Sequence, residues 1–285
     1  MSLETHDLVK SAGSISSLPT IFIRINDAVN NPRSSLADIG RVISEDPGLT
    51  ARLLRIVNSA FYSFPSKIDT ISRAVTIVGT QQLRDLALAT SVMKVFKGIP
   101  EDLINMEAFW CHSIGCGITA RVLASHRREA NLERYFVTGM LHDIGRLLLF
   151  MNLPKQSRAA LMRCQRSEEL LYKVEREEIG FDHATVGSAL LQAWNLPASL
   201  EEVVAFHHAP QKALRYPIET AIVHVADIIT HTMELGSSGE RLVPHLNSEA
   251  WEKIGLPASL LPATLGQVEK QFHDATQMIL QDNKS

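Results

Sequence analysis

Two apolar stretches of this chain carry ionisable residues at their centres. Residues 135–150 read YFVTGMLHDIGRLLLF and contain His142 and Asp143. Residues 221–229 read AIVHVADII and contain Asp227. Apolar residues cover all sides of both predicted helices, so both should be buried. Because a buried carboxylate is costly unless a cation or several donors compensate it, we expect a metal ion shared between the two helices.

Four further histidines could complete such a site: His112, His183, His207 and His208. Each alone is more often a satisfied core residue than a ligand. Together with the residues of the two apolar stretches, they give five imidazoles and two carboxylates on five predicted helices. Helical bundles build metal centres from side chains on facing helices. A mixed imidazole and carboxylate set favours iron, manganese, zinc, nickel or cobalt over calcium or magnesium.

The elements that must position these residues are helical. Apolar residues recur at helical spacing in successive stretches, namely 35–43, 49–57, 70–78, 81–96, 101–125, 132–151, 156–178, 184–194, 198–208, 218–234 and two helices within 245–282. No convincing strand alternation interrupts them, so the sequence predicts an all-α fold. The mixed-charge run at 168–178 predicts an exposed helix face.

The helix-breaking segment Gly98-Ile99-Pro100 divides the chain. We expect an N-terminal segment at 1–14, then one domain over 15–235, followed by C-terminal helices over 236–285. Within that domain, residues 15–100 form an N-terminal helical lobe and residues 101–235 form the lobe that carries the candidate metal ligands.

Composition excludes several classes of protein. The 28 basic and 31 acidic side chains give a formal charge of -3, which gives no reason to expect nucleic acid as a partner. The basic cluster at Arg127-Arg128 is short and predicts a solvated helix end. No signal pattern and no membrane-length apolar run is found, and the three cysteines lack a CxxC spacing. The chain is therefore expected to be cytoplasmic, with Cys111 and Cys116 as core residues rather than ligands.

The run Gly-Met-Leu-His-Asp-Ile-Gly-Arg around Asp143 resembles the signature of the HD superfamily of metal-dependent phosphohydrolases. More closely, the chain resembles the HDOD family, the HD-related output domains of bacterial signalling. Three stretches carry that resemblance: Leu18-Pro19 with residues 43–60, residues 71–79, and residues 180–208. The resemblance spans about residues 15–235.

The resemblance implies a multi-helical HD-like bundle with an N-terminal helical lobe. It also implies one or two divalent transition-metal ions, of iron, manganese, nickel or zinc. Asp143 would bridge two such ions. The remaining ligands would be His112, His142 and Asp227 on one ion, and His183, His207 and His208 on the other.

The function that this resemblance implies is a signal-transduction output domain that uses its metal for sensing or scaffolding. Signalling proteins would then be its partners, with no nucleic acid or membrane involved. The alternative is an active phosphohydrolase that cleaves a nucleotide phosphoester, with Asp143 and Arg146 in catalysis. The chain departs from the cyclic-di-GMP phosphodiesterase branch, because Arg146 replaces a lysine and residues 209–211 replace a Gly-Tyr-Pro loop.

Two residues near the predicted ligands admit two roles each. Arg146 lies one helical turn beyond His142, where its guanidinium could either clamp a phosphate or neutralise Asp143. His224, His231 and Asp227 share a helix face, so His224 is either a substitute ligand or a core residue.

Overall fold

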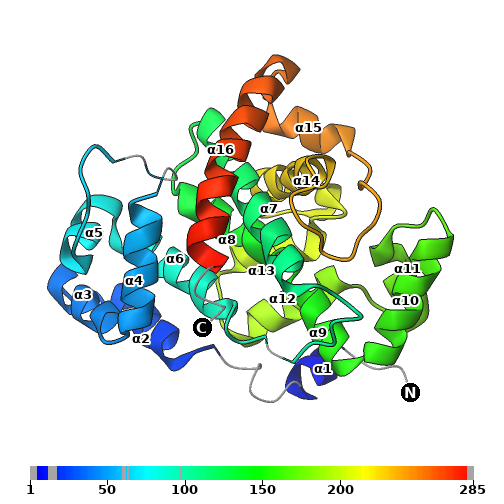
Figure 1. The fold of residues 1–285 in the computed structure, drawn as a ribbon, viewed down its shortest axis with the longest axis horizontal. Helices are drawn as coiled ribbons and strands as arrows, with labels where there is room; N and C mark the ends of the chain where they lie inside the picture. The colour runs from blue at the N-terminus through cyan, green and yellow to red at the C-terminus, as the bar shows by residue number, and fades with distance from the viewer. Residues whose placement is uncertain (1–4, 12–17, 60–61, 63, 97, 281–285) are drawn as a thin grey trace. The chain divides into compact units, whose positions relative to one another are not determined.

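The computed structural model describes residues 5–11, 18–59, 62, 64–96 and 98–280. All regular structure within these ranges is helical, which confirms the all-α prediction. The chain divides into two compact units (Figure 1), one formed by residues 1–17 and 96–264 and the other by residues 18–95 and 265–285. Residues 1–4 and 12–14 of the expected N-terminal segment, residue 60 of the matched stretch and residues 281–282 of the last predicted helix lie outside the described ranges.

The smaller unit begins with five short helices: α2 (Thr20–Asn30), α3 (Leu36–Ser44), α4 (Pro47–Val57), α5 (Ile71–Val78) and α6 (Thr80–Val92). Local capping sets their starts. The Ser35 side chain accepts a hydrogen bond from the Asp38 amide and completes a capping box. Asp46 caps α4 by accepting a hydrogen bond from the Leu49 amide, and Pro47 is the first residue of this helix. Gly79, at φ +103°, allows the turn from α5 into α6.

The larger unit holds most of the remaining helices. These are α1 (Thr5–Ser11), α7 (Met106–His126), α8 (Leu132–Leu141), α9 (Ile144–Asn152), α10 (Pro154–Arg166), α11 (Leu171–Ile179), α12 (His183–Ala193), α13 (Ala198–Phe206), α14 (Pro217–Thr232) and α15 (Ser248–Ile254), with the 3-10 turns η2 (Pro210–Lys212) and η3 (Ala258–Leu260). Helix α16 (Leu261–Leu280) starts in this unit and continues into the smaller one. None of the described helices combines the length and hydropathy needed to cross a bilayer.

Helix α7 is the central element of the larger unit and is packed against α8 and α14. Two glycines allow helices to approach closely around the turn between α8 and α9. A Cβ on Gly139 would lie 2.8 Å from the backbone of Gly117 in α7. A Cβ on Gly145 would collide with the carbonyl oxygen of His183 at the start of α12. Both glycines therefore bring the turn between them into tight contact with its neighbours.

The structure corrects the prediction of one continuous helix over 132–151. Helix α8 ends at Leu141 and α9 starts at Ile144, with His142 and Asp143 in a turn between them. The ring of His142 hydrogen-bonds the Gly139 carbonyl, which an uninterrupted helix would pair with the amide of residue 143. The predicted helix over 156–178 is likewise two helices, α10 and α11, separated at residues 167–170.

Candidate metal centre

All seven predicted ligands converge inside the larger unit. Helix α7 supplies His112, the α8–α9 turn supplies His142 and Asp143, and α14 supplies Asp227. His183 is the first residue of α12, and the pair His207-His208 follows the last residue of α13. Six of the seven side chains are buried, and His208 is half-buried. The residues that the sequence singles out therefore form one cluster, although 115 positions separate the first from the last.

The first part of the cluster surrounds Asp227. His112 Nε2 lies 3.2 Å and His142 Nε2 lies 3.4 Å from Asp227 Oδ1. His142 Nε2 is also 3.4 Å from Asp143 Oδ2. Two imidazoles and two carboxylates thus face a common point.

The second part surrounds the other oxygen of Asp143. His183 Nε2 lies 2.9 Å and His207 Nε2 lies 3.7 Å from Asp143 Oδ1. His208 Nε2 is 3.0 Å from His183 Nε2. Oδ2 of Asp143 faces the first part of the cluster and Oδ1 faces the second, so the carboxylate lies between the two parts.

Hydrogen bonds on the far ring nitrogens orient three of these imidazoles. The Nδ1 atoms of His142 and His207 lie 2.6 Å and 2.7 Å from the carbonyl oxygens of Gly139 and Val204. A carbonyl accepts only, so each Nδ1 carries a proton and each Nε2 faces the cluster, where a neutral ring offers its lone pair. His183 Nδ1 similarly contacts Glu175 Oε2 at 2.6 Å. Backbone and carboxylate partners of this kind commonly orient metal-binding histidines.

Several buried atoms of the cluster residues have no hydrogen bond of good geometry among the described residues. They are both ring nitrogens of His112, Nε2 of His142 and His207, and Oδ1 of Asp143 and Asp227. Buried polar atoms are ordinarily satisfied. A cation bonded to the nitrogen lone pairs and carboxylate oxygens would satisfy the four atoms of His142, His207, Asp143 and Asp227 and one nitrogen of His112, so the residues fit a metal.

The electrostatics of the cluster also favour a cation. Burial opposes ionisation of Asp143, yet Arg146 and His142 hold its pKa well below the usual range. Burial likewise opposes ionisation of Asp227, whose pKa is nevertheless lowered by His231 and His112. Two buried carboxylates therefore stay charged and require positive charge beside them.

The imidazoles of the cluster differ in their affinity for protons. Burial and Arg146 disfavour the charged form of His183, but Glu175 and Asp143 outweigh them and raise its pKa to about 9. Burial and the neighbouring imidazoles instead hold the pKa of His208 well below its ordinary value. His208 is therefore already neutral and could bind a metal without releasing a proton. His183 would have to release a proton when it binds a metal.

Arg146 is only 1% exposed and lies behind the cluster. Its Nη1 donates to the carbonyl oxygen and hydroxyl of Ser238, at 2.9 Å and 2.7 Å, and lies 3.3 Å from Asp143 Oδ2. Its Nε lies 3.5 Å from Glu175 Oε1. These contacts match the neutralising role for Arg146. Its Nη2 lies 3.0 Å from Nδ1 and 3.1 Å from Nε2 of His183. A phosphate clamp would require the guanidinium to leave all four partners.

Glu175 is a functional residue that the sequence analysis missed. The stretch around it predicts an exposed face, but Glu175 is 2% exposed and accepts hydrogen bonds from the amide and ring of His183. The available signal is its place on α11, where it adjoins the buried Leu171 and Val174 at helical spacing. The charge pattern alone therefore predicted an exposed position for Glu175, which in fact hydrogen-bonds the predicted ligand His183.

Of the two roles that the sequence left open for His224, the structure supports the core residue. His224 Nδ1 contacts the His207 carbonyl oxygen, and its Nε2 accepts a hydrogen bond from the Asn247 amide, so His224 is a core residue. His231 instead lies beside the cluster, with Nε2 3.4 Å from Asp227 Oδ1. The expected core behaviour of Cys116 is confirmed, since it is fully buried without a disulfide.

The loop at residues 236–242 crosses from α14 toward the α10–α11 pair. Ser237 donates its amide to the Ala108 carbonyl in α7, and Ser238 binds Arg146. Glu240 accepts a hydrogen bond from the amide of Leu171 at the start of α11, and Arg241 donates to two carbonyls at the end of α10. The loop thus joins four helices around the back of the cluster.

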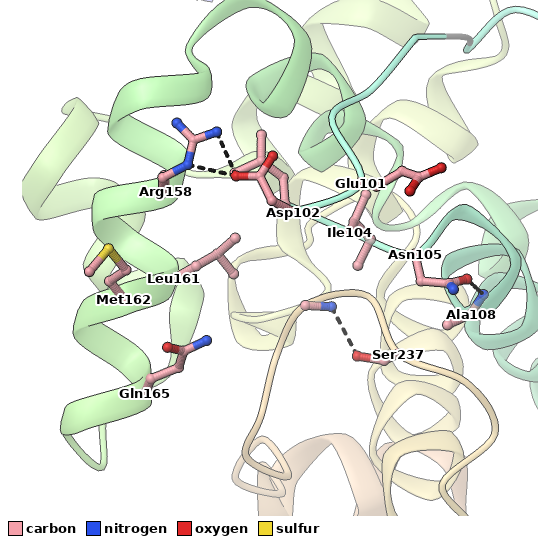
Figure 2. A pocket seen from close by; sticks show the side chains of 12 residues that line it. Glu101, Asp102, Ile104, Asn105, Ala108, Arg158, Leu161, Met162, Gln165 and Ser237 are labelled. Atoms are coloured by element: carbon pink, nitrogen blue, oxygen red, sulfur yellow. Dashed lines mark hydrogen bonds and ion pairs between the residues drawn. The ribbon is translucent and has the colours of Figure 1, made fainter.

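A separate cavity of about 320 Å³ lies on the outer side of this loop. Figure 2 shows Ser237 on one side of it and Leu161 and Met162 of α10 on the other. Asp102 and Arg158 form an ion pair at its rim, with 2.6 Å between Oδ2 and Nη2. No predicted ligand lines this cavity, so it is distinct from the metal centre.

A family comparison identifies the chain. The HDOD domain model matches residues 15–210, which is more than half of the sequence, so the chain belongs to the HDOD domain family. An uncharacterised protein of Treponema pallidum (strain Nichols) is 28% identical over 198 residues. That match covers 68% of this chain and 37% of the relative, so the chain spans well under half of the relative's length.

Solved structures share the fold. A Shewanella amazonensis protein provisionally classed as a phosphohydrolase matches with a TM-score of 0.76 at 24% identity, covering 95% of this chain and 97% of that one. An HDOD domain protein of unknown function from Geobacter sulfurreducens has a TM-score of 0.72 at 24% identity, covering 92% and 91%. A Marinobacter aquaeolei protein provisionally classed in signal transduction has a TM-score of 0.72 at 17% identity, covering 97% and 67%. At these identities the likeness establishes the HDOD-like fold.

Proposed function

We propose that this chain is a signalling output domain of the HDOD type whose His/Asp cluster holds one or two divalent transition-metal ions. The observation that carries the proposal is the set of buried nitrogen and oxygen atoms in one cluster that have no hydrogen bond of good geometry among the described residues. Iron, manganese, nickel and zinc all accept such a mixed donor set. The metal would serve sensing or scaffolding, with other signalling proteins as partners.

Seven residues would hold the metal in two groups that share one carboxylate. The first group is His112, His142 and Asp227, the second is His183, His207 and His208, and Asp143 belongs to both. When bound, paired ions of this kind supply positive charge that activates a water molecule and neutralises phosphate oxygens. The protein's own contribution is to orient the imidazoles through Gly139, Val204 and Glu175.

The contacts of Arg146 favour sensing or scaffolding over catalysis. Phosphoryl chemistry calls for cationic donors on the transferring group. The guanidinium of Arg146 instead contacts Ser238, Asp143, Glu175 and the ring of His183. Support for a signalling role comes from family membership and from the Marinobacter aquaeolei relative that is provisionally placed in signal transduction.

A metal-dependent phosphohydrolase acting on a nucleotide phosphoester is the second candidate. The division of Asp143 between two ligand groups favours it, because two adjacent metals can hold the attacking and leaving oxygens of a phosphoester. The Shewanella amazonensis protein provisionally classed as a phosphohydrolase has the same fold. A nucleotide or phosphate ligand would then bind at the half-buried His208 side of the cluster.

Metal analysis and a phosphate-release assay separate these candidates. The chain, purified without chelator, is analysed for iron, manganese, nickel and zinc, then incubated with a nucleotide panel with and without added Mn²⁺. Bound metal without turnover supports the output domain, and turnover lost in Asp143→Ala supports the enzyme. Asp69→Ala, which removes an exposed carboxylate from the other unit, is the matched control. Wild-type protein that binds none of these metals contradicts the proposal.

A further inference from the structure

Helix α14 presents a second ionisable residue to the cluster, one turn beyond Asp227. His231 and Asp227 are separated by four positions, so their side chains lie on the same helix face. The His231 side chain is 10% exposed, and its Nε2 lies 3.4 Å from Asp227 Oδ1. Its ring centre is 4.5 Å from that of His112. His231 is therefore an inward-facing residue at the edge of the proposed centre.

Asp227 Oδ1 has three imidazoles around it. The Nε2 atoms of His112, His142 and His231 lie 3.2, 3.4 and 3.4 Å from this oxygen. Oδ1 itself has no hydrogen bond of good geometry. Donor atoms bonded to a single ion at about 2.0–2.2 Å lie roughly 3 Å from one another. The spacing around Asp227 is the spacing of ligands about a common cation.

The contrast with His224 on the same helix strengthens this reading. Both ring nitrogens of His224 have backbone partners, the His207 carbonyl and the Asn247 amide. No hydrogen bond to either ring nitrogen of His231 is seen in the part of the chain that the structure describes. Nε2 of His231 can therefore offer a lone pair to an ion without breaking an existing hydrogen bond.

We propose that His231 is an additional metal ligand, which shares Asp227 and His112 with the first group. Donor atoms of these three residues all lie within 4.8 Å of one another. The inference depends on the proposed metal centre and adds a ligand to one side of it. With His231, the first group has more protein donors than the second, so an ion there is held more tightly and has fewer positions open to water. The second group, which includes the half-buried His208, holds the more exchangeable ion.

Titration of the metal-free full-length chain with Co²⁺ tests this assignment. Calorimetry gives the stoichiometry and dissociation constants, and the visible absorption of bound Co²⁺ reports its coordination. His231→Phe keeps the ring and its contact with His112 but removes the nitrogens, and His231→Gln serves as a second variant if the first fails to fold. We expect either variant to bind the tighter ion at least ten-fold more weakly and to change its absorption spectrum.

The matched control is His245→Gln, which removes an exposed histidine of the same unit and should titrate like the wild type. His231 variants that fold, as judged by circular dichroism, and bind both ions with wild-type constants and spectra would overturn the assignment and leave the metal centre intact. Wild-type protein that takes up no Co²⁺ would overturn the centre and the assignment together.

Discussion

Replacement of Arg146 by methionine tests the balance of buried charge behind the metal centre. The guanidinium is 1% exposed and compensates two carboxylates, Asp143 and Glu175, that are each 2% exposed. Methionine is also unbranched but removes the guanidinium charge that lies beside both carboxylates. Breaking a buried pair by removing one partner costs about 3–5 kcal/mol. Because about 1 kcal/mol shifts the melting temperature of a domain this size by roughly 2–4 °C, we expect a fall of about 6–20 °C in metal-free protein.

Thermal unfolding followed by circular dichroism, with and without Mn²⁺, measures this effect. Bound metal supplies positive charge to Asp143, so the loss in Arg146→Met should be smaller when Mn²⁺ is present. Arg158→Met is the control, because the Arg158–Asp102 ion pair is solvent-exposed and such pairs contribute only about 0–1 kcal/mol. A metal-free Arg146→Met protein that melts within about 2 °C of the wild type would refute the charge-balance argument.

Two further predictions concern packing and pH. Gly145→Ala should prevent α9 from packing against the start of α12 and lower the melting temperature sharply, because the added Cβ would collide with backbone atoms. The control is Gly266→Ala on α16, which should be neutral or slightly stabilising because nothing lies within 4 Å of the added Cβ. The pKa of His183 in the metal-free protein is raised from 6.5 to about 9 by Glu175 and Asp143, which outweigh burial and Arg146. A raised pKa contributes stability that is present below pH 6.5 and is lost as the pH rises through 9. The difference in melting temperature between wild type and His183→Gln should therefore shrink across that range, and a constant difference would contradict this linkage.

The sequence could predict the members of the buried cluster because they violate a strong pattern. A charged residue within a stretch that is apolar on all sides of a predicted helix needs a compensating partner, and Asp143 and Asp227 both occur in such stretches. The all-α fold could be predicted because apolar residues recur at helical spacing along the chain. What periodicity could not locate was the break at His142, because the residues on both sides of the turn are equally apolar and equally buried.

Residues that support the ligands were harder to predict than the ligands themselves. Glu175 lies among charged neighbours on α11, and only the three-dimensional packing turns it toward His183. His231 shares its helix face with His224, and periodicity alone does not say which of the two faces the cluster. The role of Ser238 depends on a hydrogen bond from Arg146, 92 positions earlier in the chain, which no local pattern encodes.

The 236–242 loop limits how the larger unit can deform. Through Ser238 it binds Arg146, and through Glu240 and Arg241 it binds the facing ends of α11 and α10. Glu175, on α11, contacts both Arg146 and His183. These contacts form a closed ring of polar interactions, so a shift of the α10–α11 hairpin must be transmitted to His183. A molecule that binds the outer surface of that hairpin and moves it would therefore displace the His183 imidazole without itself entering the cluster.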